Sequence, residues 1–153
     1  MITFVYRLTG SGSSEASIAD DSNAVMLTGI SYLSDALRDL VAAVIKLLEG
    51  GTRAEFSWST EPGEYQWLLT CRRQLLSIRI TRFAEWEQDR RTIDPGKSVL
   101  KLRCQLPDFA SAVLAQLTEL HSTLGPKGYK ERWVANGFPL SEYERLTVLL
   151  GAK

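Results

Sequence analysis

Apolar residues recur at helical spacing in two stretches of the chain. The first runs from Tyr32 to Glu49, and the second fills the segment between Pro107 and Gly125. Ser31 or Ser34 is expected to cap the first helix by accepting a backbone N–H bond, and Gly50-Gly51 is expected to end it. The two stripes predict amphipathic helices whose apolar members are Leu33, Leu37, Leu40, Val41, Val44, Ile45 and Leu48, then Phe109, Val113, Leu114, Leu117 and Leu120.

Between these helices the pattern changes to alternation of apolar and polar residues, which is typical of strands with one buried face. Leu76, Ile78 and Ile80 are predicted to point inward, as are Leu100 and Leu102. Proline and glycine mark the turns. The predicted antiparallel strands are Arg53–Ser59, Tyr65–Leu69, Leu75–Phe83 and Ser98–Leu106, joined by turns at 60–63, 71–74 and 94–96.

The two ends of the chain give weaker signals. Ile2–Leu8 is predicted to be a strand and Gly10–Ser14 a loop. Residues 16–27 are ambiguous: a short strand at Ala24–Leu27 would form a hairpin with the first strand, but residues 20–23 have the composition of a turn. Ser141–Leu150 is predicted to be a short helix opened by a capping box, Ser141 with Glu144. The fold class is therefore α+β, an antiparallel meander of four to six strands packed against two main amphipathic helices, with a short C-terminal helix.

Composition describes an ordinary globular chain. Its 153 residues, 44% hydrophobic and 24% charged, suit one domain spanning residues 1–153. Net charge is zero, which argues against nucleic acid as a partner. Residues 1–50 carry three basic and six acidic side chains, whereas residues 51–105 carry ten basic and seven acidic. This asymmetry predicts a positive sheet beside a negative helical layer.

The sequence shows no signal for export or for a membrane. The first residues lack a charged leader with a cleavage site, and no stretch has the roughly 20 apolar residues of a membrane span. We therefore expect a cytoplasmic location. Cys71 and Cys104 lie far apart and are expected to be reduced, and with His121 they do not form a structural zinc site. No cofactor and no metal are predicted.

Catalytic signals are weak. The one histidine, His121, has no G-x-S-x-G nucleophile turn to work with and is interpreted as a solvated or helix-capping side chain. Gly125-Pro126-Lys127-Gly128 lacks the spacing of a phosphate-binding loop and is interpreted as a turn that ends the second helix. The chain is therefore predicted not to be an enzyme.

The segment after the third predicted strand combines acids with a tryptophan. Glu85, Trp86, Glu87 and Asp89 are the predicted partner-binding residues, because aromatic anchors rimmed by charge are typical of binding hot spots. The alternative is a solvated loop whose tryptophan rests on the sheet edge.

Two further groups lie on the predicted sheet. Arg79, Lys101 and Arg103 point outward from the third and fourth strands and form a candidate anion-binding patch, or else an ordinary solubilising surface. Trp58, Tyr65 and Trp67 on adjoining strands are either an aromatic ligand platform or core residues that pack against the first helix. Core packing is the preferred interpretation.

Three short motifs suggest a family. Residues 61–67 read Glu-Pro-Gly-Glu-Tyr-x-Trp, and a later Tyr129-x-x-x-Trp133 segment precedes Phe138-Pro139 and the closing helix. This layout, over residues 31–150, resembles immunity-type proteins of bacterial toxin systems, and the resemblance implies a small α+β binder without catalytic residues. The neutral charge departs from the acidic character common among inhibitors of nucleases.

The leading hypothesis is a cytoplasmic domain that binds another protein, in particular as the antidote to a bacterial toxin. A second hypothesis is a binder of small anionic ligands, or an enzyme, that uses Arg79, Lys101 and Arg103. A third is a homodimer joined through a sheet edge or the C-terminal segment. The sequence does not identify the partner.

Overall fold

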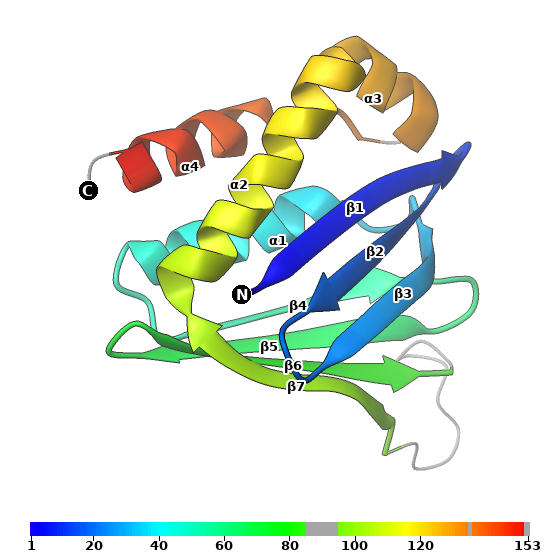
Figure 1. Ribbon diagram of the computed structural model, residues 1–153. Helices are drawn as coiled ribbons and strands as arrows, with labels where there is room; N and C mark the ends of the chain where they lie inside the picture. The colour runs from blue at the N-terminus through cyan, green and yellow to red at the C-terminus, as the bar shows by residue number, and fades with distance from the viewer. Residues whose placement is uncertain (85–94, 135, 152–153) are drawn as a thin grey trace.

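The computed structural model describes residues 1–84, 95–134 and 136–151. Its two antiparallel sheets and four helices confirm the α+β fold (Figure 1). One sheet holds β1 (Thr3–Gly10), β2 (Ser13–Ala19) and β3 (Ala24–Ser31), and the other holds β4 (Arg53–Ser59), β5 (Glu64–Arg72), β6 (Leu75–Phe83) and β7 (Lys97–Gln105). The helices are α1 (Ala36–Leu48), α2 (Leu106–Thr123), α3 (Gly125–Trp133) and α4 (Leu140–Gly151).

The four-stranded sheet follows the prediction closely. It is a meander in which each strand pairs with the next, in the order β4-β5-β6-β7. The predicted bounds of β4 and β6 are correct, while β5 extends further at both ends and β7 both begins and ends one residue earlier than predicted. Arg73 and Gln74 form the β5–β6 turn with positive φ angles of 52° and 70°, the conformation that suits a two-residue hairpin.

The N-terminal sheet differs from the prediction. The hairpin considered between Ile2–Leu8 and Ala24–Leu27 does not form, because β2 lies between β1 and β3 and pairs with both. The turn considered at residues 20–23 is present between β2 and β3, but β2 itself lies partly in the predicted loop and partly in the segment that the sequence left ambiguous. Its inward residues are Ser14, Ala16 and Ile18, and two of the three are too small or too polar to give a clear hydrophobic alternation.

The start of α1 was also predicted too early. The helix begins at Ala36, and neither Ser31 nor Ser34 caps it. Instead, the Ser31 hydroxyl donates a 2.8 Å hydrogen bond to the Glu61 carboxylate, and the Ser34 hydroxyl accepts one of 3.0 Å from the Ser59 backbone N–H. Both serines therefore join the segment before α1 to the β4–β5 turn.

The C-terminal part contains a helix that the sequence did not reveal. Gly125, at φ 68°, ends α2 as expected, but Gly125-Pro126 also opens α3. Proline is tolerated there because the first helical turn lacks internal N–H partners. The expected capping box of α4 does not form, because Ser141 lies inside the helix and its hydroxyl donates to Glu142.

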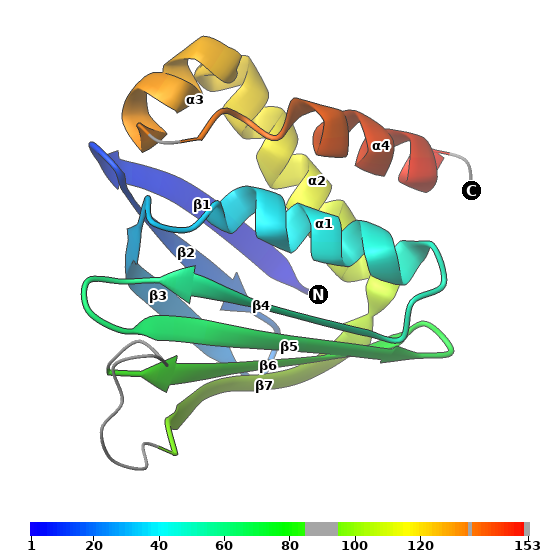
Figure 2. The same cartoon turned by 180° about the vertical axis from the view of Figure 1, so that it is seen from behind.

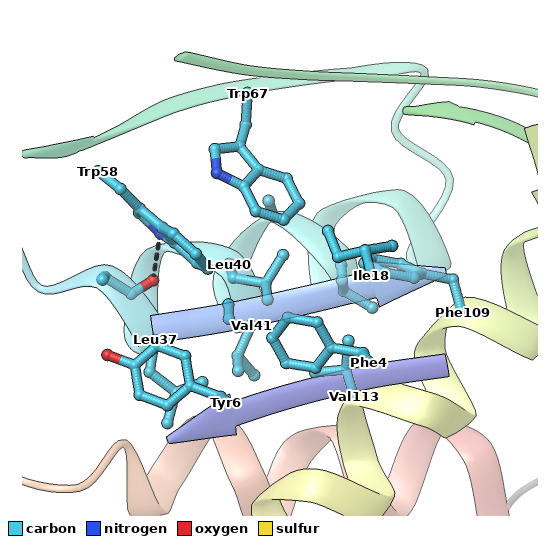
Figure 3. Packing of buried hydrophobic residues seen from close by; sticks show 14 of the residues in the cluster. Phe4, Tyr6, Ile18, Leu37, Leu40, Val41, Trp58, Trp67, Phe109 and Val113 are labelled. Atoms are coloured by element: carbon cyan, nitrogen blue, oxygen red, sulfur yellow. Dashed lines mark hydrogen bonds between the residues drawn. The ribbon is translucent and has the colours of Figure 1, made fainter. Parts of the chain in front are cut away.

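Both sheets and all four helices contribute to one hydrophobic cluster. Figure 3 shows the part of it that lies between the two sheets, α1 and α2. At its centre, the indole N–H of Trp58 donates a 2.8 Å hydrogen bond to the Ala36 carbonyl at the start of α1. The Trp58 and Trp67 rings lie 4.7 Å apart between centroids, and Tyr6 meets Trp58 edge-on. Trp58, Tyr65 and Trp67 are buried, so they are core residues and the ligand-platform alternative is wrong.

The late aromatic motif fixes the C-terminal helices. Tyr129 and Trp133 are fully buried, and Phe138 packs against Tyr129 with ring centroids 5.6 Å apart. Two ion pairs join α1 to α4. Arg38, near the start of α1, pairs with Glu142 at 3.0 Å, and Glu49, at the end of α1, pairs with Arg145 at 2.6 Å. The closing helix is thus an outer layer over α1 and α2 (Figure 2).

Tyr65 connects the two sheets. Its hydroxyl accepts a 3.3 Å hydrogen bond from the Thr28 N–H of β3 and donates one of 3.2 Å to the Thr28 carbonyl. The Arg82 guanidinium lies 5.0 Å from the centre of the Tyr65 ring and donates a 2.7 Å bond to the Thr60 hydroxyl. The Glu61–Trp67 motif therefore holds β3, the β4–β5 turn and the core together.

We expect Tyr65→Phe to lower the free energy of unfolding by about 1–2 kcal/mol, because the backbone groups of Thr28 lose their partner while partly buried. Tyr143→Phe is the matched control. Its hydroxyl bonds only the exposed Thr118 hydroxyl, and its loss should cost less than about 0.5 kcal/mol. Urea unfolding of both variants measures the difference, and equal losses would contradict the role given to Tyr65.

Candidate functional site

The outer face of the four-stranded sheet carries none of the described helices. All four helices lie on the other side of this sheet (Figures 1 and 2). The strand register places Glu55, Leu68, Arg79 and Lys101 directly opposite one another, in one row across β4, β5, β6 and β7. Polar and half-buried side chains fill the neighbouring rows. This face is a continuous surface built by every strand of the sheet.

The structure brings the three predicted anion-binding residues together on that face. Arg79 lies directly opposite Lys101, and Arg103 lies opposite Ser77, one diagonal step from Arg79. All three are exposed. No carboxylate in the described part of the chain forms an ion pair with any of them, whereas Arg53 on the far edge pairs with Glu55. We call Arg79, Lys101 and Arg103 the basic triplet.

The direct pairing of Arg79 with Lys101 is an electrostatic cost to the fold. Like charges at directly opposed positions of an antiparallel pair destabilise the sheet, by roughly the amount that opposite charges stabilise it. The neighbouring positions Ser77 and Thr81 are uncharged. Packing of the sheet does not require a cation at either position, because both side chains point away from the core and are exposed.

Two shallow hollows lie on the outer face, and Arg79 lines both. One, of about 500 Å³, is also bordered by Glu55, Gln66 and Thr81. The other, of about 310 Å³, is bordered by Ser77, the rest of the basic triplet and Asn23 of the β2–β3 turn. Arg79 therefore separates the 500 Å³ hollow, which has mixed polar walls, from the 310 Å³ hollow, which is basic.

The predicted partner-binding residues Glu85, Trp86, Glu87 and Asp89 fall in residues 85–94, outside the part of the chain that the structure describes. Their assignment remains a prediction from sequence.

The helical layer carries acidic groups on the opposite side of the molecule. Burial raises the pKa of the Asp39 carboxyl to about 6, and the nearby Asp35 carboxylate adds to the shift while Arg38 opposes it. Burial likewise raises the pKa of Asp35, which forms a 3.3 Å ion pair with Arg38. These two carboxyls lie at the start of α1, but acidic and basic side chains balance over the four helices, so the helical layer as a whole does not carry the predicted negative charge.

A third hollow, which the sequence did not indicate, lies beside α3. It measures about 770 Å³ and is lined chiefly by the apolar groups of Pro126, Val134, Phe138 and Leu140 and by two lysine stems. Val134, half exposed, ends α3 at φ 80°, where a β-branched residue is strained and glycine is usual. No sequence pattern marks this site, because its members come from a helix end and a loop.

The histidine and the two cysteines considered from the sequence do not form a catalytic or metal site among the described residues. His121 packs against Phe138 and Tyr143, with ring centroids 5.6 and 5.4 Å apart. Cys71 and Cys104 are free thiols, and burial raises the pKa of Cys104 to about 11. Within the described residues, no three His, Cys, Asp or Glu side chains gather closely enough to hold a metal ion. No helix among them has the length and apolar character needed to cross a bilayer.

We expect Lys101→Glu to raise the free energy of unfolding by about 0.5 kcal/mol at low salt, because it turns a like-charge pair with Arg79 into an attractive one. The gain should shrink in 1 M salt, where the screening length falls to about 3 Å. Urea unfolding measures it. In an Arg79→Gln background the same substitution should give no gain, and an equal gain there would place its origin elsewhere.

We expect Asp39→Asn to stabilise the protein by about 1 kcal/mol at pH 7, after allowance for partial solvent exposure. The folded pKa lies above the unfolded value of about 3.9, so ionisation costs stability as pH rises from about 4 to about 6. The gain should therefore vanish below pH 4. Thermal unfolding across this range measures it, and Asp108→Asn, at an exposed position in the first turn of α2, should show no such gain.

No family model and no curated protein matches the chain. Among solved structures, a chain of the CdiA-CT/CdiI toxin and immunity complex from Enterobacter cloacae is similar to it, with 12% sequence identity and a TM-score of 0.47. The match covers 77% of this chain and 99% of the other. A likeness at this level of identity and TM-score assigns the chain to no family.

Proposed function

We propose that this chain is a non-catalytic protein-binding domain that contacts its partner through the outer face of the four-stranded sheet. The observation that carries the proposal is the row of side chains from Glu55 to Lys101, which crosses all four strands on a face that no described helix covers. An open surface of this kind suits a protein partner, whereas small-molecule sites are usually enclosed.

The rigidity of the sheet supports the same proposal. Each strand is hydrogen-bonded to its neighbours, and Trp58, Trp67 and Leu69 pack the inner face against the core. A surface fixed in this way loses little conformational entropy when a partner binds. Four strands spaced about 4.8 Å apart, with about 3.3 Å per residue, give a plate of roughly 14 by 25 Å. Because a standard interface buries roughly 800 Å² per partner, the contact would also include flanking turns.

The finer proposal is that the domain acts in the cytoplasm as an immunity protein that neutralises a bacterial toxin. Its support is the motif resemblance in residues 61–67, 129–133 and 138–139. The residues of the first motif build the β4–β5 turn and β5, so they belong to the sheet whose outer face is the proposed contact surface.

A second candidate function is the binding of a small anion. The 310 Å³ hollow bordered by the basic triplet favours it, since guanidinium and ammonium groups bind phosphate and carboxylate directly. Thermal-shift screening with phosphorylated and carboxylated ligands separates the two functions. A concentration-dependent rise in Tm that disappears in Arg79→Ala would favour the anion.

The protein-binding proposal is tested by capture from the native host with a tagged chain, followed by mass spectrometry. We expect one stoichiometric partner, retained by wild type and lost from Leu68→Glu, which places a charge at the centre of the outer face. Val148→Glu is the matched control, because Val148 is 58% exposed on α4, away from the sheet, and this variant should retain the partner.

Capture of the same partner by Leu68→Glu at wild-type strength would exclude the outer face as the contact surface. Absence of any stoichiometric partner, together with a dimer by light scattering, would replace the proposal with self-association. Alanine at Trp86 and Glu87 in the same assay tests the loop residues predicted from sequence, with an expected loss of more than about 1 kcal/mol if they are hot spots.

A further inference from the structure

The basic triplet identifies the chemistry of the partner that the proposed surface accepts. Resting on the proposed function, we propose that it binds an extended acidic segment of the partner protein, with carboxylates at alternate residues, laid along β7. Lys101 and Arg103 are two residues apart on one face of β7, and both are exposed. Residues so placed on a strand repeat every 6.6–6.8 Å or so, which is also the repeat of alternate side chains in an extended peptide.

Arg79, on the neighbouring strand β6, adds a third cation to the spacing that matches an extended acidic peptide. It lies directly opposite Lys101, so one carboxylate placed between them contacts two cations, and a second carboxylate two residues further along contacts Arg103. The first carboxylate also removes the repulsion that the free protein bears at this pair. The guanidinium of Arg79 presents paired N–H donors that match the two oxygens of a carboxylate.

The surroundings of the triplet favour a protein segment over a free small anion. The three cations come from two strands and border a shallow hollow on an open face, whereas small-molecule sites are usually enclosed. On the other side of Arg79, Gln66 and Thr81 line the 500 Å³ hollow with groups that can hydrogen-bond a peptide backbone or polar side chains. No carboxylate in the described ranges pairs with the triplet, so an incoming acidic segment displaces no internal ion pair among them.

The test uses synthetic peptides and needs no knowledge of the natural partner. One fluorescein-labelled peptide alternates glutamate with threonine, and a second has the same composition with its glutamates in one block. Fluorescence anisotropy at low salt is expected to show tighter binding of the alternating peptide. Single replacements Arg79→Gln, Lys101→Gln and Arg103→Gln should each weaken it by about two- to fivefold, and Lys127→Gln on α3 should not.

Replacing one of these cations is not expected to unfold the protein. The Tm of each variant is measured to check that the peptide affinities are compared between folded chains. Equal affinity for the two peptides, no binding of either, or no effect of the triplet variants would each overturn the inference. Competition by inorganic phosphate at the peptide's own concentration would overturn it in favour of a small-anion site. A natural partner could be lost by Leu68→Glu but retained by the triplet variants. This result would overturn the inference that the partner presents an acidic segment, but it would leave the proposed function unchanged.

Discussion

The hydrogen bond from the Trp58 indole to the Ala36 carbonyl is the contact on which the arrangement of layers depends. It joins the inner face of β4 to the first turn of α1, and it is fully buried. A buried indole N–H without a partner costs free energy, so this bond fixes both the position of α1 and the direction in which the sheet faces. Trp67 packs on the same side at 4.7 Å. Once both tryptophans point inward, the alternation of the strands leaves the opposite face to solvent.

The motifs that suggested a family serve this arrangement. Glu61 accepts from Ser31 before α1, Tyr65 bonds both backbone groups of Thr28, and Trp67 enters the core. These residues connect the two sheets and hold β3 beside the meander. The Tyr129, Trp133 and Phe138 cluster does the same for α3 and for the segment that leads into α4. The motifs therefore specify a scaffold, and the surface that the scaffold presents is made by other residues.

The meander and the two long helices were predictable because their apolar residues are large and regularly spaced. The three-stranded sheet was only partly predictable, since β2 turns Ser14 and Ala16 inward and gives almost no hydrophobic signal. The basic triplet was predictable as a set, because alternation alone places Arg79, Lys101 and Arg103 on the outer face. The direct opposition of Arg79 and Lys101 was not, because it depends on a register with an irregularity between Ile80 and Thr81. The hollow beside α3 is lined in part by Val134, whose positive φ no propensity indicates.

The distribution of charge adds the last step. Both layers contain charges that destabilise the fold. Asp39 on α1 has a pKa raised by burial, and Arg79 lies opposite Lys101 on the sheet. Neutral or opposite charges at either place would suit folding better. The two costs differ in kind. Asp39 is half buried and its cost arises within the packed helical layer, whereas the cations of the triplet stand on an open surface where a partner can approach. A repulsion that no carboxylate of the described residues relieves by an ion pair is the more direct sign of recognition, and for that reason we propose the sheet, and not the helical layer, as the binding surface.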